Sequence, residues 1–131
     1  MDPKQNPYFM NCEEAGRFAK EWLPAWTGNQ PEKLVSFYTD DAFYLDPIVP
    51  QGVQGKEKLS VYFHKLLAKN PNWVWTQESA LPLEDGFVNK WKAEIPVKGE
   101  IVVCRGICLV HLRNNLIFRN EVYFDPTSLK P

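Results

Sequence analysis

The sequence predicts an α+β fold in which three N-terminal helices pack on a strongly curved antiparallel sheet and enclose a cone-shaped pocket. Two changes of pattern support this fold class. Up to about residue 70, apolar residues recur with the spacing of three and four that is typical of helices. From Asn72 onward they alternate with polar residues, as in strands. Because 131 residues is the size of one domain, we expect residues 1–131 to fold as a unit.

The N-terminal segment, residues 1–11, contains prolines and polar residues, and we expect a loose lead-in that docks through Tyr8 and Phe9. Asn11 is a suitable N-cap for the helix that follows. An apolar stripe marks the inner face of this helix: Ala15, Phe18, Ala19, Trp22, Leu23 and Trp26. Pro24 predicts a kink close to the end of this helix.

The next segments combine two shorter helices with one strand. Gly28 predicts the end of the first helix, and a proline at the first position opens a second helix over 31–38. We expect a turn at 39–41 and a short strand at 42–46. A third helix is predicted from about 56 to 68, with an apolar face of Leu59, Tyr62, Phe63, Leu66 and Leu67.

The second half of the chain predicts four strands that form an antiparallel meander. Asp85-Gly86 and Asn114-Asn115 are typical of tight turns between strands. The alternation over 87–95 places one set of side chains on a single face: Phe87, Asn89, Trp91, Ala93 and Ile95. The strands are expected at 73–79, 87–95, 101–112 and 116–124.

Composition and charge exclude several classes of function. The net charge is −1 and no basic run occurs, so nucleic acid is not an expected partner. No apolar run reaches the length of a membrane helix, and the first residues lack the pattern of a signal peptide. Cys12, Cys104 and Cys108 are odd in number and unevenly spaced, which favours free thiols and a cytoplasmic protein.

Asp46 is the strongest candidate for a catalytic residue, as a general base. It follows the short strand, and its neighbours are apolar or aromatic: Phe43, Tyr44, Leu45, Ile48 and Val49. A carboxylate in such surroundings can act on an apolar ligand. The alternative is that Asp46 caps the bend by accepting hydrogen bonds from the N–H groups of Ile48 and Val49. Asp40 and Asp41 are expected to be turn residues.

The remaining candidates are ligand-binding residues of an apolar pocket. The chain has five Trp, five Tyr and eight Phe, which suit a pocket for a flat apolar molecule. We expect Trp22, Trp26 and Trp91 at this pocket or in the core beside it. Tyr44 has the same strand parity as Asp46 and could donate a hydrogen bond beside it. Cys108 is expected to be a small apolar filler of the pocket wall.

The last strand leaves two alternatives open. Asn120 shares its parity with Val122 and Phe124, so Asn120 and Phe124 line the pocket if that face is the inner one. Otherwise the inner residues are Arg119, Glu121 and Tyr123. The two histidines, His64 and His111, have no paired acidic spacing, and we expect no metal site.

Several motifs, in this order along residues 12–126, resemble the nuclear transport factor 2-like superfamily, and within it the SnoaL-like polyketide cyclase and ketosteroid isomerase branch. The matching pieces are Trp26-Thr27-Gly28, Phe37-Tyr38-Thr39-Asp40-Asp41-Ala42, Asp46-Pro47, Gly55, Leu116-Ile117 and Val122-Tyr123-Phe124-Asp125. The resemblance implies a cystatin-like α+β cone around a hydrophobic pocket. It also implies a homodimer that packs through the sheet, and no metal or organic cofactor.

The resemblance carries over unevenly to individual residues. Asp46 matches the general base of the ketosteroid isomerases. Their oxyanion hole uses a tyrosine and an acid, whose positions fall near Trp22 and Cys108 in this sequence, and neither side chain is an equivalent donor. The limonene epoxide hydrolases have an aspartate where this chain has Val122.

Two functions therefore follow from the sequence. The first is an enzyme, an isomerase, cyclase or hydrolase, that uses Asp46 as general base on a small apolar molecule, with Tyr44 or Asn120 as polar partner. The alternative is a non-catalytic module of the same fold for ligand binding or dimerisation. A third possibility is recruitment of a protein partner through the exposed face of the sheet.

Overall fold

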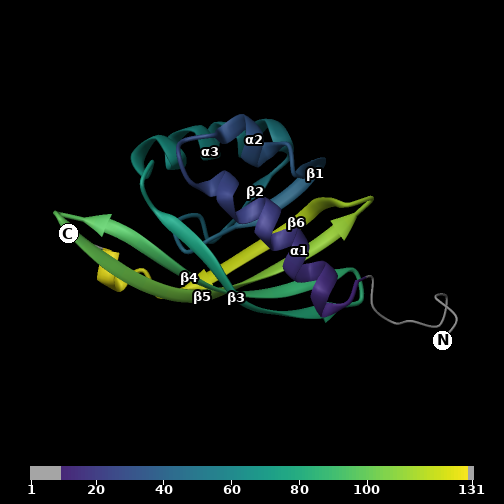
Figure 1. Ribbon diagram of the computed structural model, residues 1–131. Helices are drawn as coiled ribbons and strands as arrows, with labels where there is room; N and C mark the ends of the chain where they lie inside the picture. Colours follow the sequence, from purple (N-terminus) through teal and green to yellow (C-terminus); the bar gives the residue numbers. More distant parts are fainter. Residues whose placement is uncertain (1–9, 130–131) are drawn as a thin grey trace, which may run out of the picture.

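The computed structural model describes residues 10–129 and has the α+β architecture that the sequence predicts (Figure 1). The part of the lead-in at residues 1–9, including Tyr8 and Phe9, lies outside the described residues. The helices in the described range are α1 (Cys12–Trp22), α2 (Pro31–Val35) and α3 (Lys56–Lys69), with short 3-10 helices η2 (Leu23–Trp26) and η3 (Thr127–Leu129). The strands are β1 (Tyr38–Leu45), β2 (Val53–Gln54), β3 (Val74–Leu83), β4 (Gly86–Val97), β5 (Glu100–Arg113) and β6 (Leu116–Phe124).

Helix α1 begins where the sequence predicts but ends at Trp22, earlier than the end expected at Gly28. Asn11 forms a capping box with Glu14, in which Asn11 Oδ1 accepts from the Glu14 N–H at 2.8 Å and Glu14 Oε1 accepts from the Asn11 N–H at 3.2 Å. The α-helix stops at Trp22, because Pro24 cannot continue its hydrogen bonds, and the chain tightens into η2. Gly28 then takes a left-handed φ of 83°.

The segment around β1 corrects the sequence-based expectation. Helix α2 ends at Val35, and residues 39–41 belong to a strand that begins at Tyr38, so the turn predicted there is wrong. The partners of this strand are distant in sequence. Tyr38 is in register with Ile117 of β6, and Gln54 Nε2 donates to the Asp41 carbonyl oxygen at 2.8 Å. Local turn propensity is overridden here by pairing along the sheet.

The sheet has the strand order β2-β1-β6-β5-β4-β3. Strands β3 to β6 form the predicted antiparallel meander, but β1 runs parallel to β6, so the sheet is mixed and not purely antiparallel. It is also less curled than the sequence led us to expect. Strands β4 and β5 pair without a register shift from the Gly86–His111 pair to the Val97–Glu100 pair, and a ladder without a bulge has no point for a sharp bend.

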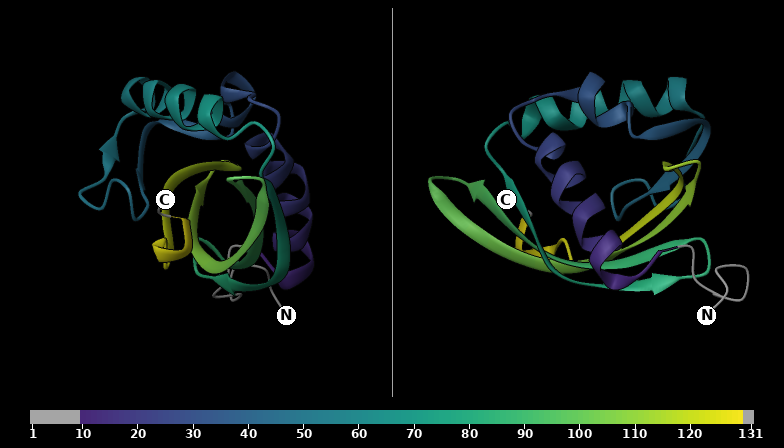
Figure 2. Two further views of the ribbon diagram at one scale, coloured as in Figure 1. Left: turned by 90° about the vertical axis from the view of Figure 1, so that its left-hand side faces the viewer. Right: turned by 45° about the vertical axis from the view of Figure 1, so that its right-hand side comes forward.

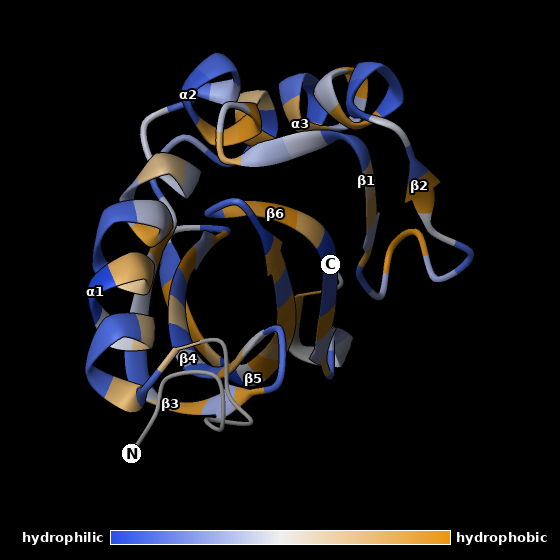
Figure 3. Ribbon diagram, turned by 90° about the vertical axis from the view of Figure 1, so that its right-hand side faces the viewer, coloured by the Kyte–Doolittle hydropathy of each residue, from blue (hydrophilic) through white to orange (hydrophobic). Residues whose placement is uncertain are grey.

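Helices and sheet bury one apolar core between them. Helix α1 packs on β3 and β4, and α3 packs on β1 and β2 (Figure 2). Helices α1 and α2 have hydrophilic residues on their outer sides (Figure 3). The predicted inner face of β4 is confirmed, since Phe87, Asn89, Trp91, Ala93 and Ile95 are all buried. The left-handed φ angles of Asn114 and Asn115, 52° and 64°, confirm the tight turn before β6.

None of the helices within residues 10–129 is both long enough and apolar enough to span a membrane.

Candidate functional site

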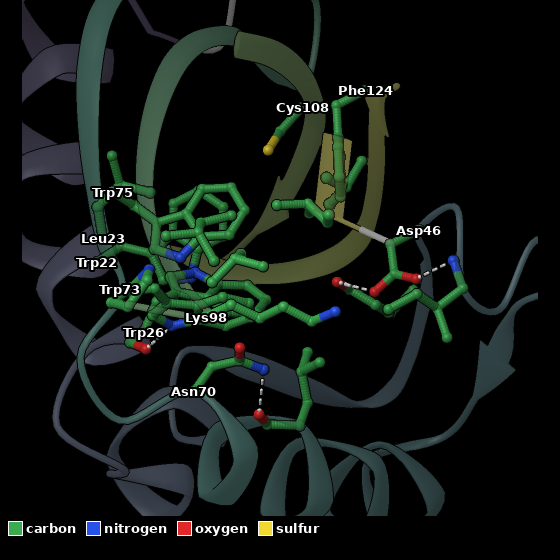
Figure 4. Close-up of a pocket in the computed structure, with 18 residues that line it drawn as sticks. Trp22, Leu23, Trp26, Asp46, Asn70, Trp73, Trp75, Lys98, Cys108 and Phe124 are labelled. Atoms are coloured by element: carbon green, nitrogen blue, oxygen red, sulfur yellow. Dashed lines mark hydrogen bonds between the residues drawn. The ribbon is translucent and has the colours of Figure 1, made fainter. Parts of the chain in front are cut away.

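A cavity of about 390 Å³ lies between the helical layer and the sheet (Figure 4). Its wall is mostly apolar and combines residues from η2, β3, β5 and β6. The polar side chains at this wall are Asp46, Tyr44, Asn70 and Lys98. The cavity is therefore a predominantly apolar space with one carboxylate and one ammonium group at its surface.

A group of tryptophans forms one side of the cavity. Trp26 is central, with ring centroids 6.2 Å from Trp22, 6.4 Å from Trp73 and 5.9 Å from Trp75. The indole N–H of Trp73 donates to the Trp26 carbonyl oxygen, and Thr27 Oγ1 donates to the Trp73 carbonyl oxygen at 2.8 Å. These two bonds tie η2 to the start of β3. We call Trp22, Trp26, Trp73 and Trp75 the tryptophan wall.

Asp46 lies on the other side of the cavity from the tryptophan wall (Figure 4) and is 5 % exposed. Its Oδ1 accepts from the N–H groups of Ile48 at 2.8 Å and Val49 at 3.1 Å. Its Oδ2 accepts from the hydroxyls of Tyr44 at 2.8 Å and Tyr62 at 2.7 Å. Asp46 therefore caps the bend, as the alternative in the sequence analysis has it, and also lies at the cavity wall.

The two tyrosines keep their protons in this arrangement. Burial, and after it the nearby carboxylate of Asp46, raises the pKa of Tyr44 well above its ordinary value. Burial and the hydrogen bond to Asp46 likewise raise the pKa of Tyr62. Both hydroxyls are thus donors at neutral pH. A carboxylate has about four acceptor positions, and Asp46 uses all of them for groups of its own chain.

Most of the other sequence-predicted pocket residues also line the cavity. Trp22, Trp26, Tyr44, Cys108 and Phe124 contribute to its wall. Burial raises the pKa of the Cys108 thiol to about 12, so this group stays neutral and fills space.

Trp91 and Asn120 are buried outside the cavity lining. Trp91 lies under Gly106, where an added Cβ would approach its ring to 2.6 Å, and it packs edge-on against Trp75 at 4.5 Å. Asn120 Nδ2 donates to Tyr38 Oη at 3.1 Å. Asn120 is inward-facing, as one of the two parity alternatives has it, but it does not line the cavity.

The structure adds residues to the site that the sequence analysis did not select. The sequence pattern placed Tyr62 on the apolar face of the third helix. Its hydroxyl, which can donate a hydrogen bond, is the feature that could have indicated a polar contact. Trp73 directly precedes β3 and Trp75 is its second residue, where strand alternation alone does not reveal a cavity. Lys98 lies in the β4–β5 turn with a left-handed φ of 51°, and Asn70 follows α3.

The described histidines are engaged in pairs away from the cavity. His64 Nε2 lies 3.0 Å from Glu32 Oε1, and His111 Nδ1 lies 2.6 Å from Asp85 Oδ1. Within residues 10–129, no three His, Cys, Asp or Glu side chains gather in a way that could hold a metal ion.

Solved structures share this fold at low sequence identity. A hypothetical protein from Catenulispora acidiphila with a ketosteroid isomerase-like fold, in complex with trimethylamine, is 22% identical, with a TM-score of 0.73 and coverage of 82% of this chain and 85% of that one. A SnoaL-like protein of unknown function from Burkholderia thailandensis is 18% identical (TM-score 0.73; 88% and 98% covered). An NTF2-like protein from Cytophaga hutchinsonii is 15% identical (TM-score 0.62; 86% and 90% covered). These likenesses define the fold class.

Residues 19–120 match the family model of the SnoaL-like domain, and the chain belongs to this family. The predicted superfamily is thereby confirmed. The curated proteins contain no match to this sequence.

Proposed function

We propose that this protein binds a small, mostly apolar molecule in its cavity, with the polar part of the molecule directed to Asp46. The observation that carries this proposal is the cavity of about 390 Å³, in which the tryptophan wall faces a buried carboxylate. Ligand sites in proteins are commonly concave and apolar, with a few polar groups that orient the ligand. The similar protein from Catenulispora acidiphila is in complex with trimethylamine, a small molecule.

A thermal-shift screen with steroids, terpenoids and aromatic ketones tests this proposal. A ligand that binds only the native state raises the melting temperature. Cys108→Phe should abolish the shift because the added ring occupies the cavity, whereas Ile107→Phe, at the neighbouring exposed position of β5, should preserve it. The proposal fails if no apolar compound shifts the melting temperature, or if both variants respond as the parent protein does.

A second candidate function is proton-transfer catalysis, as in an isomerase, cyclase or hydrolase, with Asp46 as general base. It is favoured by the place of this carboxylate at the wall of an apolar cavity. A base needs a lone pair that faces the substrate, and both Asp46 oxygens are occupied. Tyr44, which also lines the cavity, would have to turn toward the substrate and release Oδ2. Trp22 and Cys108 offer an enolate no hydroxyl or acid.

Asp46→Asn separates the two candidates. The amide retains an oxygen for the Ile48 and Val49 N–H groups, so the bend is preserved, but it cannot accept a proton. For an enzyme, turnover of an identified substrate should fall by at least about 100-fold while the ligand still binds. Unchanged turnover would exclude Asp46 as the base. Asp41→Asn, on the same strand but exposed, is the matched control.

We further propose a homodimer that packs through the outer face of the sheet. Ile101, Val103 and Ile107 alternate along β5 and are 60%, 50% and 37% exposed, and Tyr123 is the register partner of Ile107 on β6. A second copy of this face would cover these side chains. In analytical ultracentrifugation we expect a dimer that Val103→Asp converts to a monomer. A monomeric parent protein at micromolar concentration would contradict this.

Two further features favour one domain and a reducing compartment: the length of the chain, and the free thiols of Cys12, Cys104 and Cys108. We propose that the chain folds as one domain and lies in the cytoplasm. Fluorescence microscopy of a tagged chain tests the location.

A further inference from the structure

The carboxylate of Asp46 lacks a cationic partner within residues 10–129. All of its hydrogen bonds come from neutral donors, two backbone N–H groups and two tyrosine hydroxyls. Buried charges in proteins are usually paired with an opposite charge. Asp46 is 5 % exposed, and the open space beside it is the cavity. A counter-ion of the Asp46 carboxylate would therefore lie inside the cavity.

The opposite side of the same space is aromatic. The faces of tryptophan rings attract cations more strongly than those of the other aromatic side chains. Four tryptophans line the cavity, and the ring of Trp26 lies 6.2 Å from that of Tyr44, whose hydroxyl contacts Asp46. The aromatic surface thus continues from the tryptophan wall to the carboxylate, so a molecule between them contacts both.

The number of N–H donors on a cationic ligand decides which kind of cation fits beside Asp46. A primary ammonium group has three N–H donors that require acceptors. The Asp46 oxygens have no acceptor position left. A quaternary ammonium group has no N–H, and its alkyl groups match the apolar wall. Such a group gains from the charge of Asp46 and from the aromatic side chains without needing a free lone pair.

We propose that the cavity takes a small organic cation with a quaternary ammonium group, held between the tryptophan wall and Asp46. This rests on the proposed ligand-binding function and specifies its ligand class.

Lys98 is the other charged group at the cavity wall. It makes no hydrogen bond or ion pair with the described residues, and in Figure 4 its side chain extends toward the side of Asp46. Lys98 is exposed, so water screens its charge more than that of Asp46. Its ammonium group should compete weakly with a cationic ligand for the same space.

Three probes of nearly equal shape test the proposal by isothermal titration calorimetry: choline, the neutral 3,3-dimethyl-1-butanol and the anionic 3,3-dimethylbutyrate. We expect choline to bind at least about tenfold more tightly than the alcohol, and the alcohol more tightly than the anion. Asp46→Asn should remove the preference for choline over the alcohol. Lys98→Met should strengthen choline binding by about two- to fivefold. Asp41→Asn should leave all three affinities unchanged.

The outcomes separate this inference from the proposed function. If the alcohol or the butyrate binds as tightly as choline, or if Asp46→Asn keeps the preference, the cation proposal is wrong and the apolar ligand site stands. If none of the three probes binds at millimolar concentration while an apolar compound of the thermal-shift screen does, the cation proposal is also wrong. If neither the probes nor the screen gives binding, both proposals fall.

Discussion

Asp41 lies within β1, and Asp46, five positions later, directly follows the last residue of this strand. The two carboxylates nevertheless have opposite environments. The Asp41 side chain is 65% exposed and pairs with Arg113 and the Thr39 hydroxyl. Asp46 is 5 % exposed and has only neutral donors. An exposed ion pair contributes little to stability, whereas a buried carboxylate depends on every one of its donors. The charge of Asp46 is thus both costly to disturb and available to a ligand.

The largest expected effect comes from deleting the Asp46 carboxylate. Asp46→Ala leaves two N–H groups and two tyrosine hydroxyls without their acceptor, and should lower the free energy of unfolding by about 3–5 kcal/mol. Asp41→Ala should change it far less, because water replaces the partners of an exposed group. Urea unfolding of both variants measures the difference. Equal losses would remove the contrast between the two carboxylates.

The tyrosines at Asp46 predict a loss of stability in alkali. Folding raises the pKa of Tyr44 and Tyr62 above the ordinary value of 10.0, so above that pH the unfolded state binds fewer protons than the native state. Stability should be fully present below about pH 10 and fall above it, by about 1.4 kcal/mol per pH unit for each tyrosine.

Urea unfolding between pH 9 and 11.5 measures this slope. Tyr62→Phe should reduce this slope by the contribution of one tyrosine proton, and Asp41→Asn should leave the slope unchanged. A slope that Tyr62→Phe does not alter would show that Tyr62 ionises equally in both states.

The two tyrosine hydroxyls also differ in burial. Tyr44→Phe and Tyr62→Phe each remove one hydrogen bond to Asp46 Oδ2, and each should cost about 1–2 kcal/mol in the free energy of unfolding. Tyr44 is almost fully buried and Tyr62 is half-buried, so the Tyr44 variant should lose more. Only Tyr44 lines the cavity, so Tyr44→Phe should also alter ligand affinity more than Tyr62→Phe does. The reverse order would contradict this arrangement.

The smallest effect is expected at Asp41. The hydroxyl of Thr39, and after it Arg113, holds the pKa of Asp41 below its ordinary value. The stability from this group is present above the unfolded pKa and is lost as the pH falls through the folded one. Arg113→Gln should raise the pKa of Asp41 in an NMR titration with little change in the melting temperature. A pKa that does not move would exclude Arg113 as a partner in solution.

Local patterns predicted a large part of the fold. The Asn11 cap, the break at Pro24 and the asparagine turn before β6 depend on neighbouring residues, and the structure confirms them. The parallel pairing of β1 with β6 and the short strand β2 could not be predicted in this way, because their partners lie far away in the sequence. For the same reason residues 39–41 were expected to form a turn.

By itself the sequence determined the order of helices and strands and marked Asp46 as an acid among apolar neighbours, because period and local composition act within a few residues. Only the tertiary structure decided what surrounds that acid. Tyr62 reaches Asp46 because α3 packs on β1, and the tryptophan wall forms because η2 and the start of β3 meet. Contacts of this kind depend on how distant segments pack, which no local pattern encodes.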